Sequence, residues 1–302
     1  MCRNCDTKPV ILLTNNKKGL CKSCFFRYFE RKVNKTINDF KLINKGEKIG
    51  VAISGGKDSL TLLYILNKLK EKKRFKIEAL LIDEGIKGYR DLSMKDAEKF
   101  CRDLKIKLNI VSYKKEFGYT LDQLIKKLKM KPCSICGVFR RYLLNKYSRK
   151  LKFDKLATGH NLDDEVQTIL MNQFRNNPEV SARLGPITGI EDDKKFVRRI
   201  KPLYMLTEKE TTTYAYLKNF NLKFCECPYN TEAYRISVRE IVNRMEEKYP
   251  GTKHSILKSF LEILPLLKEK YKGSKYEIKY CRKCKEPSSK DICQKCGILS
   301  KL

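Results

Sequence analysis

Ile49-Gly-Val-Ala-Ile53 runs directly into Ser54-Gly55-Gly56-Lys57-Asp58-Ser59, and a helical pattern over 60–69 follows. This order predicts a strand, a tight loop and a helix start. Two glycines let the backbone approach an anion closely, and the amides and dipole at a helix start favour negative charge. The side chains of Ser54, Lys57 and Ser59 add donors. The stretch therefore predicts a phosphate-binding loop; a plain glycine turn capped by Asp58 and Ser59 is the alternative.

The rest of the central region alternates strand and helix patterns, which favours an α/β fold with a doubly wound parallel sheet. Further strands are predicted over 76–82, 106–111 and 155–158. Helices are predicted over 92–104, 121–130, 137–149 and 163–174. A loop is expected over 176–201, and three more helices over 207–220, 232–248 and 253–271. Ligands of such sheets bind at the carboxyl ends of the strands, where the phosphate loop, Asp83-Glu84 and Gly159 fall.

The composition points to a polyanionic partner. The chain has 302 residues with 66 Lys+Arg against 35 Asp+Glu, a formal charge of +31. Binding of two zinc ions by eight thiolates would lower this charge to about +27 without changing its sign. Nucleic acid is the first candidate partner for such an excess, and a compositional bias toward lysine on solvated helix faces is the alternative.

The apolar runs are short, and the N-terminus Met1-Cys-Arg-Asn-Cys5 has no signal-peptide core. We therefore expect a soluble cytoplasmic chain that does not enter a membrane. In that reducing compartment, 13 cysteines favour ligands or catalysts over disulfides.

Eight of the cysteines form two four-cysteine modules, one near each end. Each module contains two CxxC pairs, and four thiolates in this spacing are typical of structural zinc with no open coordination position. Short terminal segments of this kind depend on the metal for their folding free energy. The predicted zinc ligands are Cys2, Cys5, Cys21 and Cys24 at one end and Cys281, Cys284, Cys293 and Cys296 at the other.

A third set of cysteines lacks this pattern. Cys133 and Cys136 form a lone CxxC, and Cys225 and Cys227 follow downstream. A lone CxxC suits a redox dithiol, whereas three thiolates suit an iron–sulfur cluster with one iron that lacks a protein ligand. The sequence alone leaves both readings open. Cys101, in a helical pattern beside Phe100, is expected to be an ordinary core cysteine.

Thr158-Gly-His-Asn-Leu-Asp-Asp-Glu165 also combines two readings. Asn161 is a good helix N-cap, and acidic residues in the following turn complement the helix dipole. Alternatively, Asp163 and Asp164 hold Mg²⁺ or act as a general base, and Gly159 lets an adenosine pack on the backbone. His160 is interpreted as structural. Arg140 and Arg141, one turn after Cys136, are either a solvated basic face or an anion clamp, and their place beside the candidate cluster favours the clamp.

Six ordered motifs together resemble a known family. They are the N-terminal CxxC pairs running into Cys24-Phe-Phe-Arg-Tyr-Phe-Glu30, SGGKDS, Cys133-Ser-Ile-Cys-Gly137, residues 158–165, Cys227-Pro-Tyr229 with Ala233-Tyr-Arg235, and the C-terminal CxxC pairs. This order is similar to that of the tRNA 2-thiouridine synthetases of the PP-loop family, which modify the T-loop or wobble uridine. The resemblance implies an ATP-dependent sulfurtransferase, a 4Fe–4S cluster, two zinc ions and a homodimer.

The resemblance also assigns residues. Cluster ligands carry over to Cys133, Cys136 and Cys227, the last preferred over Cys225 because Pro-Tyr follows it. The family's essential aspartate maps to Asp164, and Asp58, Lys57 and Arg140 complete the expected catalytic set. Relatives from bacteria commonly have lysine at position 140; arginine keeps the charge but cannot act as a neutralisable base. The expected nucleotide positions are Ala52, Ile53, Ser54, Gly55, Gly56, Asp58, Ser59, Ile82, Arg140, Gly159, Asp163 and Asp164.

The implied reaction has two stages. The loop binds ATP with Mg²⁺, uracil O2 attacks the α-phosphorus and pyrophosphate leaves; sulfide on the open iron then attacks C2 and AMP leaves. A ubiquitin-like sulfur carrier or free sulfide would supply the sulfur. The alternatives are persulfide chemistry on Cys133 and Cys136 without a cluster, a different PP-loop synthetase, and a non-catalytic zinc protein that binds RNA.

Three domains are expected. Residues 1–30 form an N-terminal zinc finger, residues 31–273 form the PP-loop catalytic domain with its helical C-terminal part, and residues 274–302 form the C-terminal zinc finger.

Overall fold

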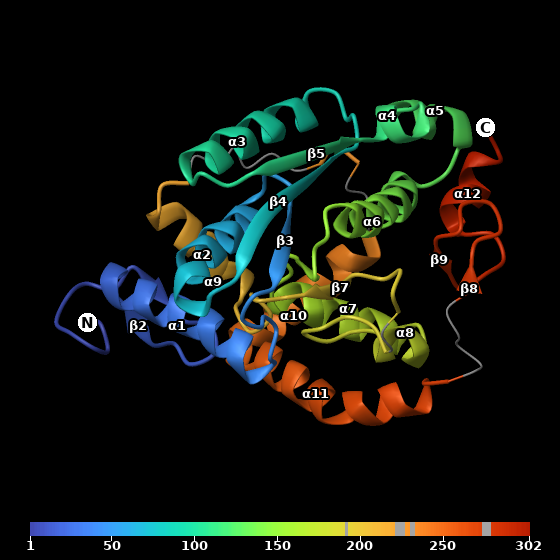
Figure 1. The fold of residues 1–302 in the computed structure, drawn as a ribbon. Helices are drawn as coiled ribbons and strands as arrows, with labels where there is room; N and C mark the ends of the chain where they lie inside the picture. The colour runs from blue at the N-terminus through green and yellow to red at the C-terminus, as the bar shows by residue number, and fades with distance from the viewer. Residues whose placement is uncertain (191–192, 221–226, 230–232, 274–278) are drawn as a thin grey trace.

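A computed structural model describes residues 1–190, 193–220, 227–229, 233–273 and 279–302. Its centre is a five-stranded parallel sheet in the order β5-β4-β3-β6-β7 (Figure 1). The strands are β3 (Lys48–Ile53), β4 (Lys76–Asp83), β5 (Leu108–Ser112), β6 (Lys155–Ala157) and β7 (Arg198–Ile200). Helices separate the strands along the chain, so the predicted doubly wound α/β fold is confirmed.

Alternation along β4 explains why both faces of the sheet are covered. Ala79 and Leu81 belong to one apolar core with α1, α2 and α3, while Leu80 and Ile82 belong to another with α5 and α6. Successive side chains of a strand point to opposite faces, so a run of buried residues serves two helix layers. The helices up to α6 are α1 (Lys22–Asp39), α2 (Lys57–Lys73), α3 (Tyr89–Asp103), α4 (Tyr113–Phe117), α5 (Leu121–Leu128) and α6 (Pro132–Lys150).

Helices α7, α10 and α11 form a third apolar core beside the sheet, whereas α9 packs in the core of α1 and α2. Leu162 and Val166 of α7 pack there with Val238 of α10 and Leu257 of α11. The helices of this half are α7 (Leu162–Phe174), α8 (Pro178–Ala182), α9 (Glu208–Leu217), α10 (Ala233–Lys248) and α11 (Thr252–Lys270). No helix in the described residues is long and apolar enough to span a membrane.

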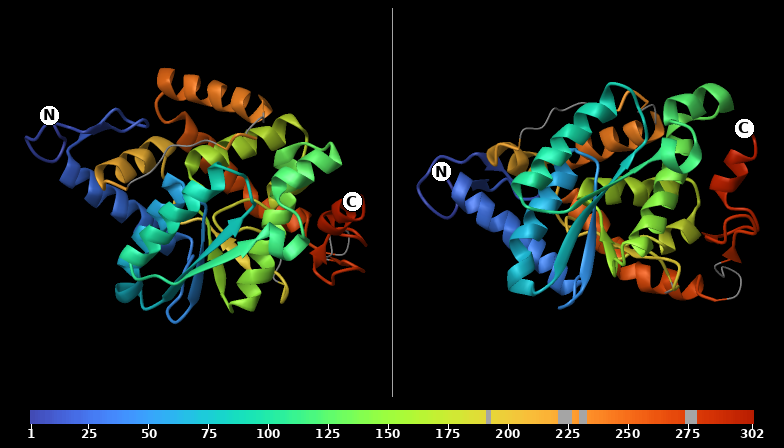
Figure 2. Two further views of the ribbon diagram at one scale, coloured as in Figure 1. Left: turned by 90° about the horizontal axis from the view of Figure 1, so that it is seen from above. Right: turned by 45° about the horizontal axis from the view of Figure 1, so that its top comes forward.

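The two cysteine modules lie at opposite ends of the molecule in every ribbon view (Figure 2). The N-terminal module contains the hairpin β1 (Ile11–Leu12) and β2 (Gly19–Leu20), and the C-terminal module contains β8 (Lys279–Tyr280), β9 (Pro287–Ser288) and α12 (Gln294–Leu299). Helix α1 runs without a break through the expected boundary at residue 30, and the expected boundary at residue 274 opens a stretch outside the described residues. The domain limits stay predictions.

Two expected elements differ from the structure. Helix α6 begins at Pro132 and not at Gly137, because proline is favourable in the first turn of a helix. Cys133 and Cys136 are therefore helical. The segment expected as a loop over 176–201 contains α8 and the edge strand β7, whose three residues are too few to show a periodic pattern.

Candidate active site

The phosphate loop lies at the carboxyl end of β3, in the middle of the sheet. Gly55 has φ +83°, and an added Cβ would lie 2.5 Å from the Ser93 carbonyl oxygen, so this position requires glycine. The Ser54 amide donates to Ser59 Oγ at 3.1 Å, and Ser59 Oγ donates to the Gly56 carbonyl at 2.9 Å. These bonds fold the loop over the start of α2, which presents the first-turn amides of that helix to an anion.

Lys57 belongs to the loop but does not line the cavity that the loop borders. Its Nζ is 3.0 Å from Asp58 Oδ2 and 2.9 Å from Glu208 Oε1. Burial lowers the pKa of Lys57, but the two carboxylates outweigh it and raise that pKa. Lys57 thus positions Asp58. Burial in turn raises the pKa of Asp58, and Lys57 counteracts this shift.

A cavity of about 350 Å³ opens in front of the loop. Its walls come from β3, β4, α6 and the segment after β6. Nine of the expected nucleotide positions line it: Ala52, Ile53, Ser54, Asp58, Ser59, Ile82, Arg140, Gly159 and Asp164. Gly55, Gly56 and Asp163 do not. The structure adds Glu84, Arg90, Arg141, Leu144, Thr158, His160 and Arg199.

Close backbone contact explains the glycine after β6. A Cβ added at Gly159 would lie 3.0 Å from both the Asp58 carbonyl carbon and the Ser59 amide nitrogen. A side chain there would press on the phosphate loop itself. The glycine therefore serves the approach of two backbone segments, while the nearby His160 ring is exposed and bonds to Thr158 Oγ1 at 2.9 Å.

Asp164 is held by the start of α7. Asn161 caps the helix as predicted: its side chain accepts from the Asp164 amide, and its own amide donates to Asp164 Oδ2 at 3.1 Å. Burial raises the pKa of Asp164 to about 7, and the neighbouring Asp58 carboxylate adds to the shift. Two carboxylates so close together, both on the cavity wall, are suited to hold Mg²⁺.

The structure places Asp163 differently from the prediction. Its carboxylate is buried, pairs with the ammonium of Lys253 and accepts the Glu208 amide at 2.8 Å. Because adjacent residues at a helix start point in different directions, only Asp164 reaches the cavity. Asp163 instead joins α7 to α9 and α11, and Asp58 takes the place expected for it beside Asp164.

A buried ion pair forms the wall between the cavity and the third cysteine set. Glu84, 1% exposed, follows β4 and pairs with Arg90, whose guanidinium also donates to the Ser54 carbonyl at 2.8 Å. Arg140 Nη1 lies 3.7 Å from Glu84 Oε1. Glu84 could be singled out from the sequence, because it follows the end of a predicted strand. Arg90 and Arg199 carry no comparable signal, because one lies in the first turns of a helix and the other in a three-residue strand.

Cys133, Cys136 and Cys227 converge next to this wall. Burial raises the pKa of Cys227, and the neighbouring Cys133 adds to the shift. Burial likewise raises the pKa of Cys136, and Glu84 and Cys227 add to it while Arg140 opposes it. Cys133 Sγ donates to the Tyr229 carbonyl at 3.3 Å, which ties α6 to the segment that carries Cys227. This arrangement of three thiols fits the ligand set of an iron–sulfur cluster. Cys225 lies outside the described residues.

The terminal modules each bring four sulfurs within 4.8 Å of one another. Zn–S bonds of about 2.3 Å in a tetrahedron require sulfurs about 3.8 Å apart. The sulfurs of Cys5 and Cys24 are 3.8 Å apart, and those of Cys284 and Cys293 are 3.7 Å apart. A hydrogen bond from Ser23 lowers the pKa of Cys21 to about 6, which favours a thiolate. Both modules thus fit a tetrahedral thiolate site. Cys101, by contrast, is buried in the core as predicted.

Fold and site together define an ATP pyrophosphatase of the PP-loop type, and comparison with known proteins agrees. Residues 27–245 match the PP-loop domain family, so the chain belongs to that family.

Within it, the chain belongs with the tRNA 2-thiolation proteins. It is 40% identical to the tRNA-5-methyluridine(54) 2-sulfurtransferase of Pyrococcus horikoshii over 98% of this chain and 92% of that one. It is 34% identical to tRNA 2-thiolation protein NcsA of Haloferax volcanii over 100% of this chain and 98% of that one. The structure of the U34-tRNA thiolase NcsA from Methanococcus maripaludis, solved with its 4Fe–4S cluster, matches with a TM-score of 0.85 at 33% identity and covers 100% of this chain and 96% of that chain.

Proposed function

We propose that this protein is an ATP-dependent tRNA uridine 2-sulfurtransferase that activates uracil O2 by adenylation and replaces it with sulfur. The observation that carries the proposal is that the nucleotide cavity and the three cysteines are neighbours. Glu84 and Arg140 belong to the wall of the nucleotide cavity and also act electrostatically on Cys136. An activated base in the cavity would therefore lie beside the three thiols, as a reaction with two stages in one place requires.

The position of each residue in the site indicates its role in the proposed reaction. The loop residues Ser54 and Ser59 and the first turn of α2 would bind the phosphates of ATP. Asp58 and Asp164 would hold Mg²⁺, which neutralises charge on those phosphates. Arg140 is placed to stabilise negative charge that develops between the cavity and the cysteines. Gly159 and Ile82 would receive the adenosine.

The three cysteines fit a 4Fe–4S cluster, which supplies one iron without a protein ligand where sulfide can bind. Cys133 and Cys136 in the first turn of α6 and Cys227 would hold it. The four-cysteine modules would each hold zinc. The positive charge of +31 suits tRNA as the substrate. A homodimer, a cytoplasmic location and a carrier protein or free sulfide as the sulfur source stay predictions.

Cys227→Ser tests the proposal directly, because a hydroxyl is a much poorer ligand for iron than a thiolate. After anaerobic purification, we expect about four irons per wild-type chain, and Cys227→Ser should lose the iron absorbance and tRNA thiolation together. Release of pyrophosphate that depends on tRNA should continue, because the phosphate loop is unchanged. The measurements are absorbance and metal analysis, mass spectrometry of tRNA nucleosides and a pyrophosphate assay.

Cys225→Ser, two positions away, is the matched control and should keep iron, thiolation and pyrophosphate release. An active Cys227→Ser that retains its iron would overturn the ligand assignment. An active wild type that holds zinc but no iron after reconstitution would replace the cluster with the persulfide route through Cys133 and Cys136.

A further inference from the structure

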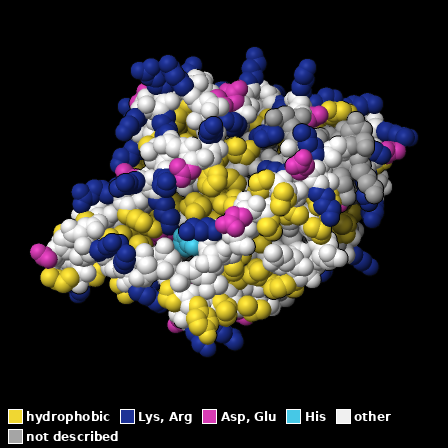
Figure 3. Space-filling view, turned by 90° about the horizontal axis from the view of Figure 1, so that it is seen from below, with side chains coloured by type: hydrophobic (Ala, Val, Ile, Leu, Met, Phe, Trp, Pro, Cys, Tyr) yellow, Lys and Arg dark blue, Asp and Glu magenta, His cyan; other side chains and the backbone are white. Residues whose placement is uncertain are grey.

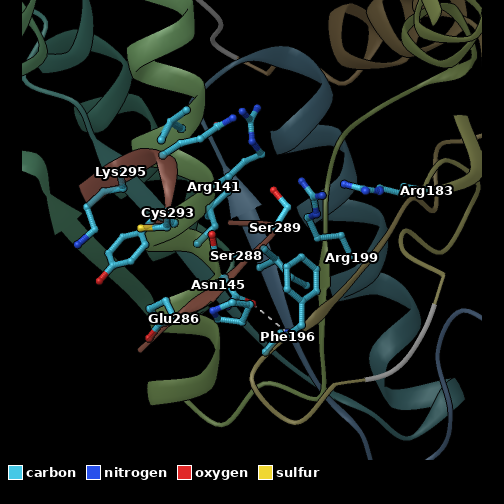
Figure 4. A pocket seen from close by; sticks show the side chains of 17 residues that line it. Arg141, Asn145, Arg183, Phe196, Arg199, Glu286, Ser288, Ser289, Cys293 and Lys295 are labelled. Atoms are coloured by element: carbon cyan, nitrogen blue, oxygen red, sulfur yellow. Dashed lines mark hydrogen bonds between the residues drawn. The ribbon is translucent and has the colours of Figure 1, made fainter. Parts of the chain in front are cut away.

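A second cavity lies directly beside the nucleotide site and is not used by the function proposed above. It encloses about 320 Å³ between α6, β7 with the segment before it, and the C-terminal cysteine module (Figure 4). Arg141, Leu144 and Arg199 line both cavities. A ligand in the second cavity would therefore lie next to whatever occupies the first.

The cavity carries an excess of positive charge. Arg141, Arg183, Arg199 and Lys295 line it, and the one carboxylate among the described lining residues, Glu286, is paired with Arg149. Arg183 also pairs with Glu179, which does not line the cavity. Burial lowers the pKa of Arg199, and the adjacent Arg141 lowers it further. Neighbouring cations of this kind are stabilised by an anion between or beside them. Arg183 and Lys295 do not line the nucleotide cavity, so the positive charge of the second cavity extends beyond the nucleotide site.

An exposed aromatic ring, that of Phe196, lines the same cavity. Phe196 is 38% exposed although it is a large apolar side chain. The amide of Asn145 fixes the backbone on both sides of it: Nδ2 donates to the Lys195 carbonyl at 2.8 Å, and Oδ1 accepts the Val197 amide at 2.9 Å. Figure 4 shows the Phe196 ring next to Arg199, with Arg183 on the same side of the cavity and Lys295 across from them. A fixed, exposed ring beside guanidinium groups is a stacking platform for a nucleobase.

The wall opposite β7 belongs to the C-terminal module. Ser288 and Ser289 bring hydroxyl groups to it. The module is attached beside the cavity by the Arg149–Glu286 ion pair and by a hydrogen bond from Tyr280 to Asp193. The cavity thus exists only because this module is folded and docked.

We propose that this cavity binds one unpaired nucleotide of the RNA substrate next to the target uridine, with its phosphate at Arg183 and Arg199 and its base on Phe196. The inference rests on the function proposed above, since that function makes RNA the polyanion that reaches this face. Recognition of a neighbouring base would hold the target uridine in the catalytic cavity and exclude uridines in other contexts. Figure 3 shows Lys and Arg side chains at many places on the face of the molecule that it draws, so bulk charge alone cannot provide this selection.

The test is binding of an unmodified tRNA transcript, measured as the dissociation constant at several salt concentrations. Phe196→Ala should weaken binding about 5- to 150-fold, the range expected for one lost base stack, without changing the salt slope. Phe196→Tyr should restore it, because the stacking face is kept. Arg183→Gln should reduce the slope of log K against log salt by roughly 0.7–0.9, the contribution of one phosphate contact.

The matched controls are distant: Lys107→Gln removes an exposed charge at β5, and Tyr216→Ala removes an exposed ring from α9; both should bind tRNA as the wild type does. Binding of ATP and the two zinc ions expected per chain should be unchanged in every variant. Wild-type affinity and slope in Phe196→Ala and Arg183→Gln would overturn the inference while leaving the sulfurtransferase intact. Failure of the wild-type protein to bind tRNA at all would instead overturn the proposed function.

Discussion

At the scale of single residues, Asp164 is a carboxyl group whose negative charge is unfavourable in the ligand-free protein. Asp164 and Asp58 both lie on the wall of the nucleotide cavity, and burial together with this like charge raises the pKa of Asp164 to about 7. A carboxyl with a raised pKa binds a proton more tightly in the folded than in the unfolded chain. The stability of the ligand-free protein should therefore fall as pH rises from about 4 to about 7 because of this group.

Asp164→Asn should remove that loss. The variant keeps an oxygen to accept the Asn161 amide but cannot ionise. Above pH 7, we expect its free energy of unfolding to exceed that of the wild type by at most about 4 kcal/mol. Near pH 4, the two free energies of unfolding should be equal. Urea unfolding of ligand-free protein across this pH range measures the difference. Asp163→Asn is the contrasting control: it weakens a buried pair with Lys253 and should destabilise the protein.

These two aspartates also show the limit of reading single residues from the sequence. The motif around Asn161 predicted the helix cap and the carboxylates in its first turn. It could not say which carboxylate faces the cavity, because that depends on Lys253, which lies 90 positions further along the chain. Arg90 was missed for a related reason: its partner Glu84 lies on a strand end that only the folded sheet brings against the helix.

At the scale of elements, β3 has one position where the packing leaves no room. A Cβ added at Gly50 would lie 2.1 Å from Cδ2 of Phe153, whose ring is buried against this face of the sheet. Since β3 leads into the phosphate loop, the fit of this strand also sets the position of the loop.

Gly50→Ala should therefore destabilise the protein by about 1–3 kcal/mol through overpacking. Phe153→Leu, which shortens the opposing ring, should make the double variant more stable than the sum of the two single effects by about 0.5–3 kcal/mol. Urea unfolding of all three variants gives the coupling. Gly297→Ala, where no atom lies within 4 Å of the added Cβ, should be nearly neutral. Strict additivity of the two changes would contradict this account.

Element types followed from the sequence where the pattern was long. The buried run of β4 and the helical period of α7 were predicted almost to their ends. Helix α6 begins five residues before the predicted start, at Pro132, a residue that is favourable in the first turn of a helix. This difference matters for the site, because Cys133 and Cys136 lie about one turn apart at the start of the same helix and therefore face Cys227 together.

At the scale of the whole molecule, the two cysteine modules look alike in sequence but are joined to the core differently. Cys21 and Cys24 of the N-terminal module belong to the same apolar core as Phe25, Phe29 and the central sheet. The described cysteines of the C-terminal module form a small cluster of their own, with Ile298 reaching the core on α6. Polar contacts provide much of the remaining attachment.

This asymmetry predicts different results when one metal site is removed from each end. Cys284→Ser should lower the zinc content from two ions to one per chain and weaken tRNA binding, because the wall with Ser288 and Ser289 is lost. Binding of ATP should persist, since residues 52–199 line the nucleotide cavity.

Cys5→Ser should remove one zinc as well, but it should lower the main melting temperature by more than about 5 °C, because the start of α1 is part of the central core. Metal analysis, calorimetry and the two binding assays separate these outcomes. Equal losses of melting temperature in the two variants would show that the modules support the fold alike, and retention of full tRNA affinity by Cys284→Ser would remove the C-terminal module from the RNA site.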